Sequence, residues 1–305
     1  AAADESLAST PVAVVSPAAF WRSAWKYRTM GYRYCFWDNG TVMANLLAIA
    51  NSLGQPARLL AGFVDRDVDA VLGVDSEQEA STCLVALGQP RGPRPYVVRE
   101  LTHIGSGDLG FSDPIPYPES DLIQAEARLE SSDEVMAWRG HAHGNEARIP
   151  SIGSAPLGEA ILGRGSTRRF AREPITVDQL LALLAAASTV TPADFGGGLN
   201  EPYLIVNAVD GLTPGAYHYS RESKELELLQ EGEFRAEAGH LCFEQALGAD
   251  ASAVVFFLAD LELGLGKFGN RGYRAAQLEA GVMGGNVYIA AHSLGLGATG
   301  MTFFD

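Results

Sequence analysis

The sequence predicts an α+β fold in which short strands and long helices form two partial copies of one unit. Of its 305 residues, 47% are apolar, which is enough to bury one large core or two modest ones. Short apolar runs of strand length alternate with longer segments of helical character. A stretch near the start of the chain also returns near its end, and such a repeat decides how the rest is interpreted.

The repeat has a nearly constant offset. Lys26 to Arg33 returns as Lys267 to Arg274, an offset of 267 − 26 = 241 positions, and 12–15 falls on 253–256. Residues 63–65 correspond to residues 303–305 at an offset one residue shorter. We therefore treat residues 12–65 and 253–305 as two copies. Further pairs that keep the offset are Asp38 and Glu279, Gly40 and Gly281, Asn45 and Asn286, and Leu53-Gly54 and Leu294-Gly295.

Each copy predicts a short buried strand, an irregular loop, a helix of about 22 residues and a second strand. Gly54 and Gly295 stand where a left-handed C-terminal cap is expected. Gly281, Gly284 and Gly285 would each weaken the second long helix by about 1 kcal/mol, which is tolerable where close packing requires them. Either a dimer-like helix seam or a simple crowded helix crossing would explain them.

The other elements follow from local signals. Asp65 to Gly73 predicts a capped short helix, and prolines at 90, 93 and 95 together with the polar segment 102–118 indicate a connector. Thr176 and Gln179 form a capping-box signal for a helix over 180–187. A helix is also expected over 120–139, and strands over 82–87, 203–208 and 253–258.

The predicted organisation is the C-terminal half of a first copy over 1–100, a connector over 101–150 and a second copy over 151–305. The second copy has no counterpart of 65–87 after Asp305, and the first has no counterpart of 151–170. Because a missing strand leaves unpaired backbone groups, we expect a longer parent chain or completion by another subunit, as a homodimer or pseudo-dimer.

The composition disfavours several classes of binding partner. The net charge of −15 would repel nucleic acid and an anionic membrane. No apolar run reaches 18 residues, and the acidic start is unlike a signal peptide. Three widely spaced cysteines without a C-x-x-C pair disfavour a disulfide framework or a zinc site. We therefore expect a cytoplasmic protein with no nucleic-acid or membrane partner.

The segment 160–170 predicts an anion clamp. If the chain is extended from Ser166, alternation places Arg164, Ser166 and Arg168 on one side. Each charged hydrogen bond from arginine to a phosphate oxygen contributes about 1.5–3 kcal/mol, so this spacing could hold a mononucleotide phosphate. A solvated basic turn is the alternative, because short motifs have many chance matches.

This segment, with the helix that follows it over 176–184, resembles the opening of the FMN-dependent nitroreductase superfamily, whose R-x-S-x-R stretch holds the FMN phosphate and ribityl chain. Residues 211–219 and 269–274 resemble the SagB-type branch, whose members oxidise thiazolines and oxazolines in peptides to azoles. The resemblance covers most of 155–305. It implies a nitroreductase-like FMN-binding fold, arranged here as a tandem pseudo-dimer, with FMN as the cofactor.

The resemblance also implies catalytic residues. SagB-type proteins carry a Lys-Tyr pair before the G-Y-R element, present here as Lys26-Tyr27, for proton transfer beside the flavin. Because both side chains have reference pKa values of about 10, they need desolvation or a nearby cation to act near neutral pH. A snorkelling surface lysine is the other interpretation of Lys26. In the second copy the pair is Lys267-Phe268, and phenylalanine cannot carry a proton.

Glycines indicate where the backbone is expected to approach the flavin ring. The family's P-S-x-G-like loop aligns with 195–198, so Gly197 and Gly198 are expected at the flavin wall, although the Pro-Ser element is absent and a surface turn would also explain them. Gly62 keeps a family-like G-F element that 301–303 has lost. His141-Ala142-His143 has no further ligand at recognisable spacing, so we expect an exposed loop and no metal site.

Together these features predict an FMN-dependent oxidoreductase that oxidises azoline rings in a small molecule or peptide. An NAD(P)H-dependent nitro or quinone reductase and a catalytically inactive FMN-binding scaffold subunit of a biosynthetic complex are the alternatives.

Overall fold

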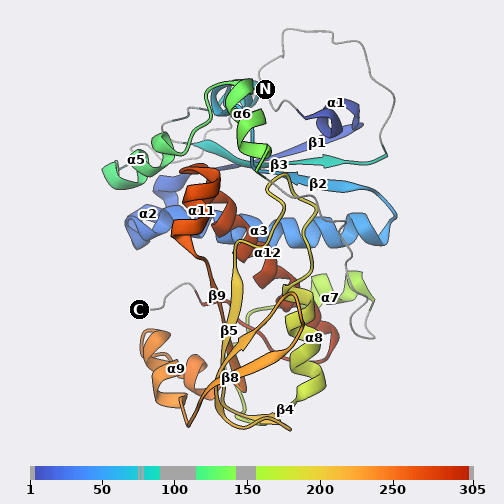
Figure 1. Ribbon diagram of the computed structural model, residues 1–305, viewed down its shortest axis with the longest axis vertical. Coiled ribbons are helices and arrows are strands. Elements are labelled where there is room, and N and C mark those ends of the chain that lie inside the picture. The colour runs from blue at the N-terminus through green and yellow to red at the C-terminus, as the bar shows by residue number, and fades with distance from the viewer. Residues whose placement is uncertain (1–3, 75, 77–78, 90–114, 142–155, 302–305) are drawn as a thin grey trace. The chain divides into compact units, whose positions relative to one another are not determined.

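The structure is a computed structural model that describes residues 4–74, 76, 79–89, 115–141 and 156–301 (Figure 1). Its elements, in chain order, are α1 (Glu5–Ser9), β1 (Val12–Ala18), α2 (Phe20–Tyr27), α3 (Met30–Ser52), β2 (Ala57–Leu60), α4 (Asp65–Leu72), β3 (Ala80–Leu87), α5 (Pro118–Glu126), α6 (Ser132–Arg139), α7 (Leu157–Gly163), β4 (Ile175–Thr176), α8 (Val177–Ala187), β5 (Glu201–Val206), β6 (Val209–Asp210), β7 (Gly215–Tyr219), β8 (Leu226–Glu231), α9 (Arg235–Leu241), α10 (Ala246–Asp250), β9 (Ala253–Leu258), α11 (Leu261–Phe268) and α12 (Arg271–Ser293).

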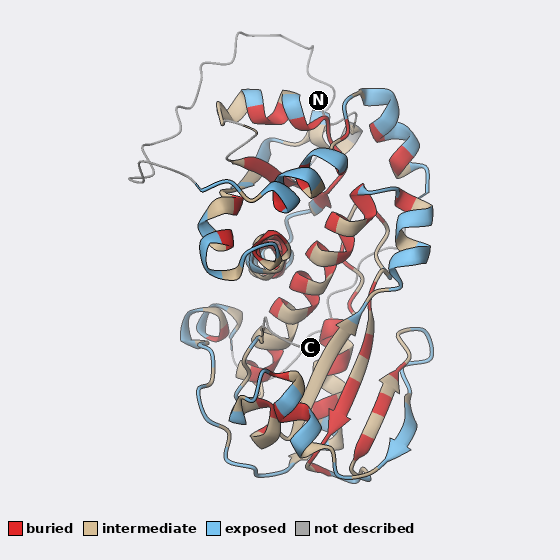
Figure 2. Ribbon diagram, turned by 90° about the vertical axis from the view of Figure 1, so that its left-hand side faces the viewer, coloured by how far each residue is buried: buried red, intermediate tan, exposed pale blue. Residues whose placement is uncertain are grey.

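The chain divides into two compact units. Unit 1 comprises Ala1–Ala147, Val190–Gly197 and Asp260–Gly281, and unit 2 comprises Arg148–Thr189, Gly198–Ala259 and Val282–Asp305. Helix α12 therefore begins in unit 1 and ends in unit 2. Buried positions, red in Figure 2, occur in both units. The boundaries expected at residues 100 and 150 stay predictions.

Unit 1 contains a three-stranded antiparallel sheet in the order β1-β3-β2. The central strand β3 is buried at every position except its last, which agrees with the apolar run that predicts it. Leu60, Phe63, Val68 and Leu84 form a core cluster between this sheet and α4. The segment 190–197 joins the unit, because Ala193 forms a parallel bridge with Leu59 of the edge strand β2.

Unit 2 contains a four-stranded antiparallel sheet in the order β8-β7-β5-β9, and β4 pairs with β6 in parallel. Helix α8 begins with the predicted capping box, in which the Thr176 hydroxyl accepts the Gln179 N–H and the Gln179 side chain accepts the Thr176 N–H. Its buried leucines pack against the sheet. The core cluster consists of Leu180, Leu184, Leu204, Val206, Val209, Tyr217 and Tyr219.

The repeat offset reappears in the elements. Helices α2 and α11 have eight residues each, α3 and α12 have 23 each, and every boundary differs by 241 positions. Arg28 and Gly269, which separate each short helix from its long one, have φ of 52° and 56°. Gly54 and Gly295 have φ of 61° and 72°, as the predicted caps require.

One expectation about the copies is wrong. The irregular loop expected before each long helix is the short helix, α2 or α11. Its packing depends on a glycine at the second position of the long helix. At Gly31 a Cβ would lie 2.7 Å from the Ala24 backbone nitrogen, and at Gly272 one would lie 2.7 Å from the Gly264 carbonyl oxygen. Local sequence does not report this helix-to-helix contact, so the short helix was missed.

Within unit 1, α3 and the start of α12 cross with their backbones in close contact. A Cβ on Gly281 would lie 2.5 Å from the Trp37 carbonyl oxygen, and one on Gly40 would lie 2.5 Å from the Leu278 carbonyl oxygen. Since Trp37 and Leu278 are also related by the offset, the two halves of this contact are reciprocal. The rings of Tyr32 and Tyr273, another offset pair, stack with centroids 6.4 Å apart.

The helix expected over 120–139 is two helices, α5 and α6. The chain leaves helical geometry between them because its backbone groups bond elsewhere in unit 1. The Leu129 N–H donates to Asp65, whose own N–H donates to the Leu129 carbonyl, and the Ala127 carbonyl accepts from Arg271. Ser131 then caps α6 by accepting the Glu134 N–H. A buried carboxylate elsewhere in the chain thus sets this break.

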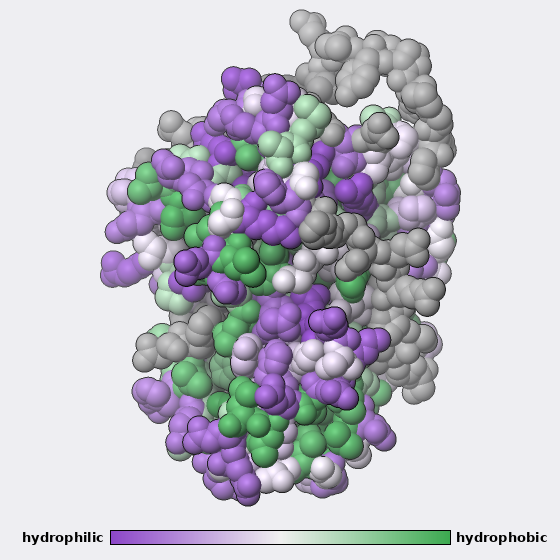
Figure 3. All heavy atoms as spheres, viewed as in Figure 1, coloured by the Kyte–Doolittle hydropathy of each residue, from purple (hydrophilic) through white to green (hydrophobic). Residues whose placement is uncertain are grey.

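None of the described helices is long and apolar enough to cross a membrane. On the face drawn in Figure 3, hydrophobic residues form several patches separated by hydrophilic ones. The connector expected over 101–150 lies partly outside the described residues, as do Ala142, His143 and residues 302–305.

Adding one methyl group at the crossing should destabilise unit 1. We expect Gly281→Ala to lower the free energy of unfolding by about 1–3 kcal/mol, because the new Cβ meets backbone that cannot move aside. Gly266→Ala in α11 is the control within unit 1, since a Cβ there would meet nothing within 4 Å and alanine favours helix by up to about 1 kcal/mol. All four tryptophans, at 21, 25, 37 and 138, lie in unit 1, so urea denaturation followed by tryptophan fluorescence reports its unfolding. Equal stabilities of the two variants would contradict the packing argument.

Candidate functional site

The predicted anion clamp lies in unit 2, directly after α7. The helix ends at Gly163, and Arg164 has φ −66° and ψ 140°, so the chain becomes extended where the alternation requires it. Ser166 forms a parallel bridge with Ala298, and the Thr167 N–H donates to the Ala298 carbonyl at 2.8 Å. The chain is therefore extended from Arg164 to Thr167 and bends at Arg168, so the placement of Arg168 on the same side as Arg164 and Ser166 stays a prediction.

Two predicted clamp residues converge on Tyr288 of α12, which sequence reasoning did not single out. The Arg164 guanidinium lies 5.3 Å from the centroid of the Tyr288 ring, and the Ser166 hydroxyl lies 3.1 Å from the Tyr288 hydroxyl. The Nε of Arg164 is buried and has no hydrogen-bond partner within the described residues. Arg168 and the neighbouring Arg169 are exposed. Arg164 and Ser166 therefore contact Tyr288, whereas the Arg168 side chain is exposed to solvent.

The predicted catalytic pairs lie at the ends of α2 and α11 in unit 1. Lys26 is exposed, with its Nζ 4.8 Å from the centroid of the Tyr27 ring. Tyr27 also packs edge-on against Tyr34, with centroids 4.8 Å apart. In the second copy the Lys267 Nζ lies 5.0 Å from the Phe268 ring. The two pairs thus share one local geometry, and their proposed catalytic role stays a prediction.

The surroundings of the second pair differ from those of the first. Phe268 is 2% exposed and packs against Trp138 and His141, with ring centroids 5.4 and 6.4 Å away. Lys267 instead borders an open groove of about 570 Å³, which is also lined by Asp260, Glu262, Leu263 and Gly266. Lysine at this position therefore faces accessible space, while its neighbour belongs to the core of unit 1.

Gly62, one of the predicted cofactor-binding glycines, is enclosed by unit 1. Its N–H donates to Asp194 Oδ2 at 2.9 Å, and a Cβ at this position would lie 2.7 Å from the Trp138 ring. Close approach of a neighbouring aromatic ring is thus a sufficient reason for glycine here. Its role toward a cofactor stays a prediction.

The glycines at the predicted flavin wall form an unusual turn. Gly196, Gly197 and Gly198 have φ of 77°, 72° and 79°, a left-handed run that residues with side chains rarely adopt. Asp194 anchors the chain just before this turn, because it accepts the N–H groups of Ala61 and Gly62. The turn therefore starts from a fixed point on the edge of the β2 region.

Asp194 is a buried carboxylate that sequence reasoning missed. Arg139 Nε donates to it at 2.8 Å, and Arg139 also donates to the Gly62 carbonyl. Burial raises the pKa of Asp194, and Arg139 and the two backbone amides oppose that rise. The only signal in the sequence is an acidic residue two positions before a glycine run, which is also typical of an ordinary turn.

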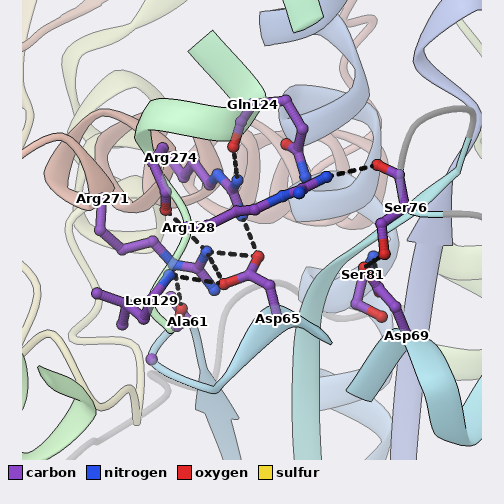
Figure 4. A network of polar contacts seen from close by, with 12 residues as sticks. Ala61, Asp65, Asp69, Ser76, Ser81, Gln124, Arg128, Leu129, Arg271 and Arg274 are labelled. Carbon is purple, nitrogen blue, oxygen red and sulfur yellow. Dashed lines mark hydrogen bonds and ion pairs between the residues drawn. The ribbon is translucent and has the colours of Figure 1, made fainter. Parts of the chain in front are cut away.

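The G-Y-R element of the second copy lies in a buried charge network of unit 1 (Figure 4). Arg271 Nη1 donates to both oxygens of Asp65 at 2.8 Å, and Arg274 Nη1 donates to Oδ1 at 2.7 Å. Backbone carbonyls accept further donors of the arginines: Arg271 also bonds Ala61 and Ala127, and Arg274 bonds Gln124, while Arg271 Nη2 is buried without a hydrogen-bond partner among the described residues. The two arginines of the motif therefore stabilise the fold in the described structure.

This network fixes the protonation state of Asp65. Burial would raise the pKa of the Asp65 carboxyl, but the adjacent Arg271 and Arg274 outweigh it and hold the pKa below its usual value. Arg274 Nε also donates to the Tyr32 hydroxyl at 3.0 Å, which ties the network to α3. Nearby in Figure 4, Asp69 accepts from Ser76 and from the Ser81 N–H, joining α4 to β3.

No group of three or more His, Cys, Asp or Glu side chains within the described residues could hold a metal ion. Cys35, Cys83 and Cys242 are free thiols. Burial raises the pKa of Cys35 to about 11 and that of Cys83 to about 12, so both remain protonated near neutral pH.

Residues 161–305 match the family model described as "Nitroreductase family". A protein of Methanocaldococcus jannaschii, named "Putative nitroreductase MJ1384", is 30% identical over 169 residues, which are 52% of this chain and 85% of that protein. This similarity covers the greater part of the relative.

A solved structure from Anabaena variabilis, described as a "putative nitroreductase", matches 98% of this chain with a TM-score of 0.79 and 26% identity. The chain spans 65% of the length of that structure. The match includes both units, so the arrangement of residues before 161 is also found in a protein of that description.

Replacing the buried carboxylate should destabilise unit 1. We expect Asp65→Asn to cost about 3–5 kcal/mol, because two buried guanidinium groups lose their counter-charge. The stabilisation should be complete above the ordinary aspartate pKa of about 3.9 and be lost as pH falls through the lowered folded pKa.

Urea titrations followed by tryptophan fluorescence between pH 7 and pH 3 measure this effect. Asp67→Asn, on the exposed side of the same helix, is the control and should cost less than about 1 kcal/mol. An Asp65→Asn variant with the wild-type acid dependence would show that the carboxylate contributes nothing.

Proposed function

Because the chain belongs to the nitroreductase family, whose members generally bind flavin, we propose that it is an FMN-dependent oxidoreductase of the SagB type. The observation that carries the cofactor proposal is the convergence of Arg164 and Ser166 on Tyr288 where α7 gives way to extended chain. The buried, unpartnered Nε of Arg164 and the exposed Arg168 are donors that suit a phosphate dianion.

The residues toward FMN have distinct proposed tasks. Arg164, Ser166 and Arg168 would hold the phosphate, and the left-handed turn at Gly197 and Gly198 would present backbone to the ring. When bound, the flavin supplies a two-electron acceptor for hydride. Arginine suits the phosphate because its planar fork matches two oxygens at once.

The proposed substrate is a thiazoline or oxazoline ring within a peptide. Conversion of such a ring to the azole removes two hydrogens, one leaving with its electron pair as hydride and the other as a proton. Lys26 and Tyr27 are the proposed acceptors of that proton, in keeping with their position at the end of α2. The family resemblance of this pair and of the G-Y-R elements supports this choice of substrate.

A tandem, pseudo-dimeric arrangement is part of the proposal. It is supported by element boundaries that repeat at 241 positions and by the reciprocal contact of Gly40 and Gly281. In such an arrangement the working pair would belong to the first copy, because Phe268 is buried and has no exchangeable proton. We place the protein in the cytoplasm on the composition already described.

Two other functions have support of their own. One alternative is reduction of a nitro or quinone compound by NAD(P)H, and the description of the relatives as putative nitroreductases supports its nitro substrate. Phe268, packed into the core, favours a scaffold subunit that binds FMN without turnover. Oxidation of an azoline peptide with bleaching of the bound flavin supports the first function, and bleaching by NADPH alone supports the second. Absence of both reactions supports the third.

The clamp proposal predicts loss of flavin from one double variant. Arg164→Ala with Arg168→Ala should weaken FMN binding by about 3–6 kcal/mol, since two charged donors to the phosphate are removed. Arg169→Ala is the matched control, because it removes the same charge from an exposed arginine that the proposed clamp does not include. Flavin fluorescence titration gives both affinities. Full flavin content in the double variant would refute the clamp.

The copies should respond unequally to substitution. Tyr27→Phe should lower the rate of flavin reduction by azoline about 10²–10⁴-fold while FMN stays bound, because only the proton carrier is removed. Lys26→Ala should resemble it, whereas Lys267→Ala should retain most activity. Stopped-flow single turnovers measure these rates. If Lys26→Ala kept its activity and Lys267→Ala lost it, catalysis would be assigned to the second copy.

A further inference from the structure

We propose that Tyr288 is a positioning residue of the phosphate clamp, which orients the Ser166 hydroxyl as a donor toward the anion. This inference rests on the proposed function of the clamp. The two hydroxyl oxygens are 3.1 Å apart, and Tyr288 projects from α12 toward the segment that follows α7.

Either hydroxyl could donate to the other, and the proposal assigns the donor role to Tyr288. The Gly300 N–H donates to the Tyr288 hydroxyl oxygen, so that oxygen already accepts one bond. Its own proton is then available for Ser166 Oγ. A serine hydroxyl that accepts from tyrosine keeps its single proton for another acceptor. Since Ser166 is exposed, that acceptor can be an oxygen of a bound anion.

The same ring supports Arg164. The guanidinium lies 5.3 Å from the ring centroid, a distance at which an aromatic face attracts a cation. The ring therefore holds the charged donor while its hydroxyl orients the neutral one. Tyr288 thus contacts both Arg164 and Ser166, the two clamp residues that are two positions apart in the extended segment.

The chain on both sides of Ser166 is closely packed against the end of α12 and the residues that follow it. A Cβ on Gly297 would lie 2.5 Å from the Thr167 hydroxyl oxygen, and one on Gly163 would lie 2.9 Å from His292 Nε2. His292 lies one helical turn after Tyr288. The segment 297–300, which pairs with Ser166 through Ala298, and the end of α12 therefore both fix the extended segment that carries Ser166.

The first copy has no equivalent arrangement. Through the 241-residue offset Tyr288 corresponds to Leu47, which is 5% exposed and has no hydroxyl group. The described part of the first copy also has no R-x-S-x-R segment. The phosphate-directed hydroxyl pair therefore belongs to the second copy.

The test compares Tyr288→Phe with wild type for two flavins, FMN and riboflavin, which differ only in the phosphate. The variant keeps the ring beneath Arg164 and loses only the hydroxyl. We expect FMN affinity to fall about 5–30-fold and riboflavin affinity to stay within twofold, both measured by fluorescence titration. Tyr217→Phe is the control, since it removes a hydroxyl that bonds the Thr213 carbonyl elsewhere in unit 2.

A double-mutant cycle shows whether Tyr288 acts through Ser166. The FMN cost of Tyr288→Phe should nearly vanish in a Ser166→Ala background, because the residue that it orients is gone. Additive losses, equal losses for both flavins, or unchanged FMN affinity in Tyr288→Phe would each overturn the inference while the clamp itself stands. Wild type that binds FMN no more tightly than riboflavin would overturn the clamp proposal with it.

Discussion

The carboxylate of Asp65 is the interaction on which unit 1 depends. It is 1% exposed, and Arg271, Arg274 and the Leu129 amide all donate to it. These donors come from the start of α12 and from the chain between α5 and α6. A buried carboxylate without them would be strongly unfavourable, so every one of these segments must be in place for the unit to be stable.

This constraint explains features that otherwise look unrelated. The break between α5 and α6 exists because its backbone groups bond Asp65 and Arg271. The network holds the start of α12 within unit 1, where Gly281 crosses Gly40 without intervening side chains. Two guanidinium groups face one carboxylate, and backbone carbonyls accept most of their remaining donors, with Arg271 Nη2 left buried and unbonded among the described residues. Structural demands alone therefore account for both arginines of the G-Y-R region.

The residues proposed to bind the cofactor and substrate take no part in the Asp65 network. The clamp in unit 2 leaves Ser166 and Arg168 exposed, and the ends of α2 and α11 leave Lys26 exposed and Lys267 beside an open groove. These side chains are not needed to neutralise a buried charge. Side chains without such a structural role are available to bind a cofactor or substrate, whereas Arg271 and Arg274 are buried against Asp65.

The sequence alone determined the secondary structure wherever a signal was local: the capping box at Thr176, the left-handed caps at Gly54 and Gly295, the extended segment after Gly163 and the 241-residue repeat. It also indicated the family, through motifs that are contiguous in the chain. Only tertiary structure decided that α2 and α11 are helices, that residues 127–131 interrupt a helix, and that Tyr288 and Asp194 contact residues far away in sequence. The physical reason is that hydrogen bonds and close packing between distant segments override weak local preferences, and no local pattern encodes which distant partner a buried carboxylate or a tyrosine hydroxyl will meet.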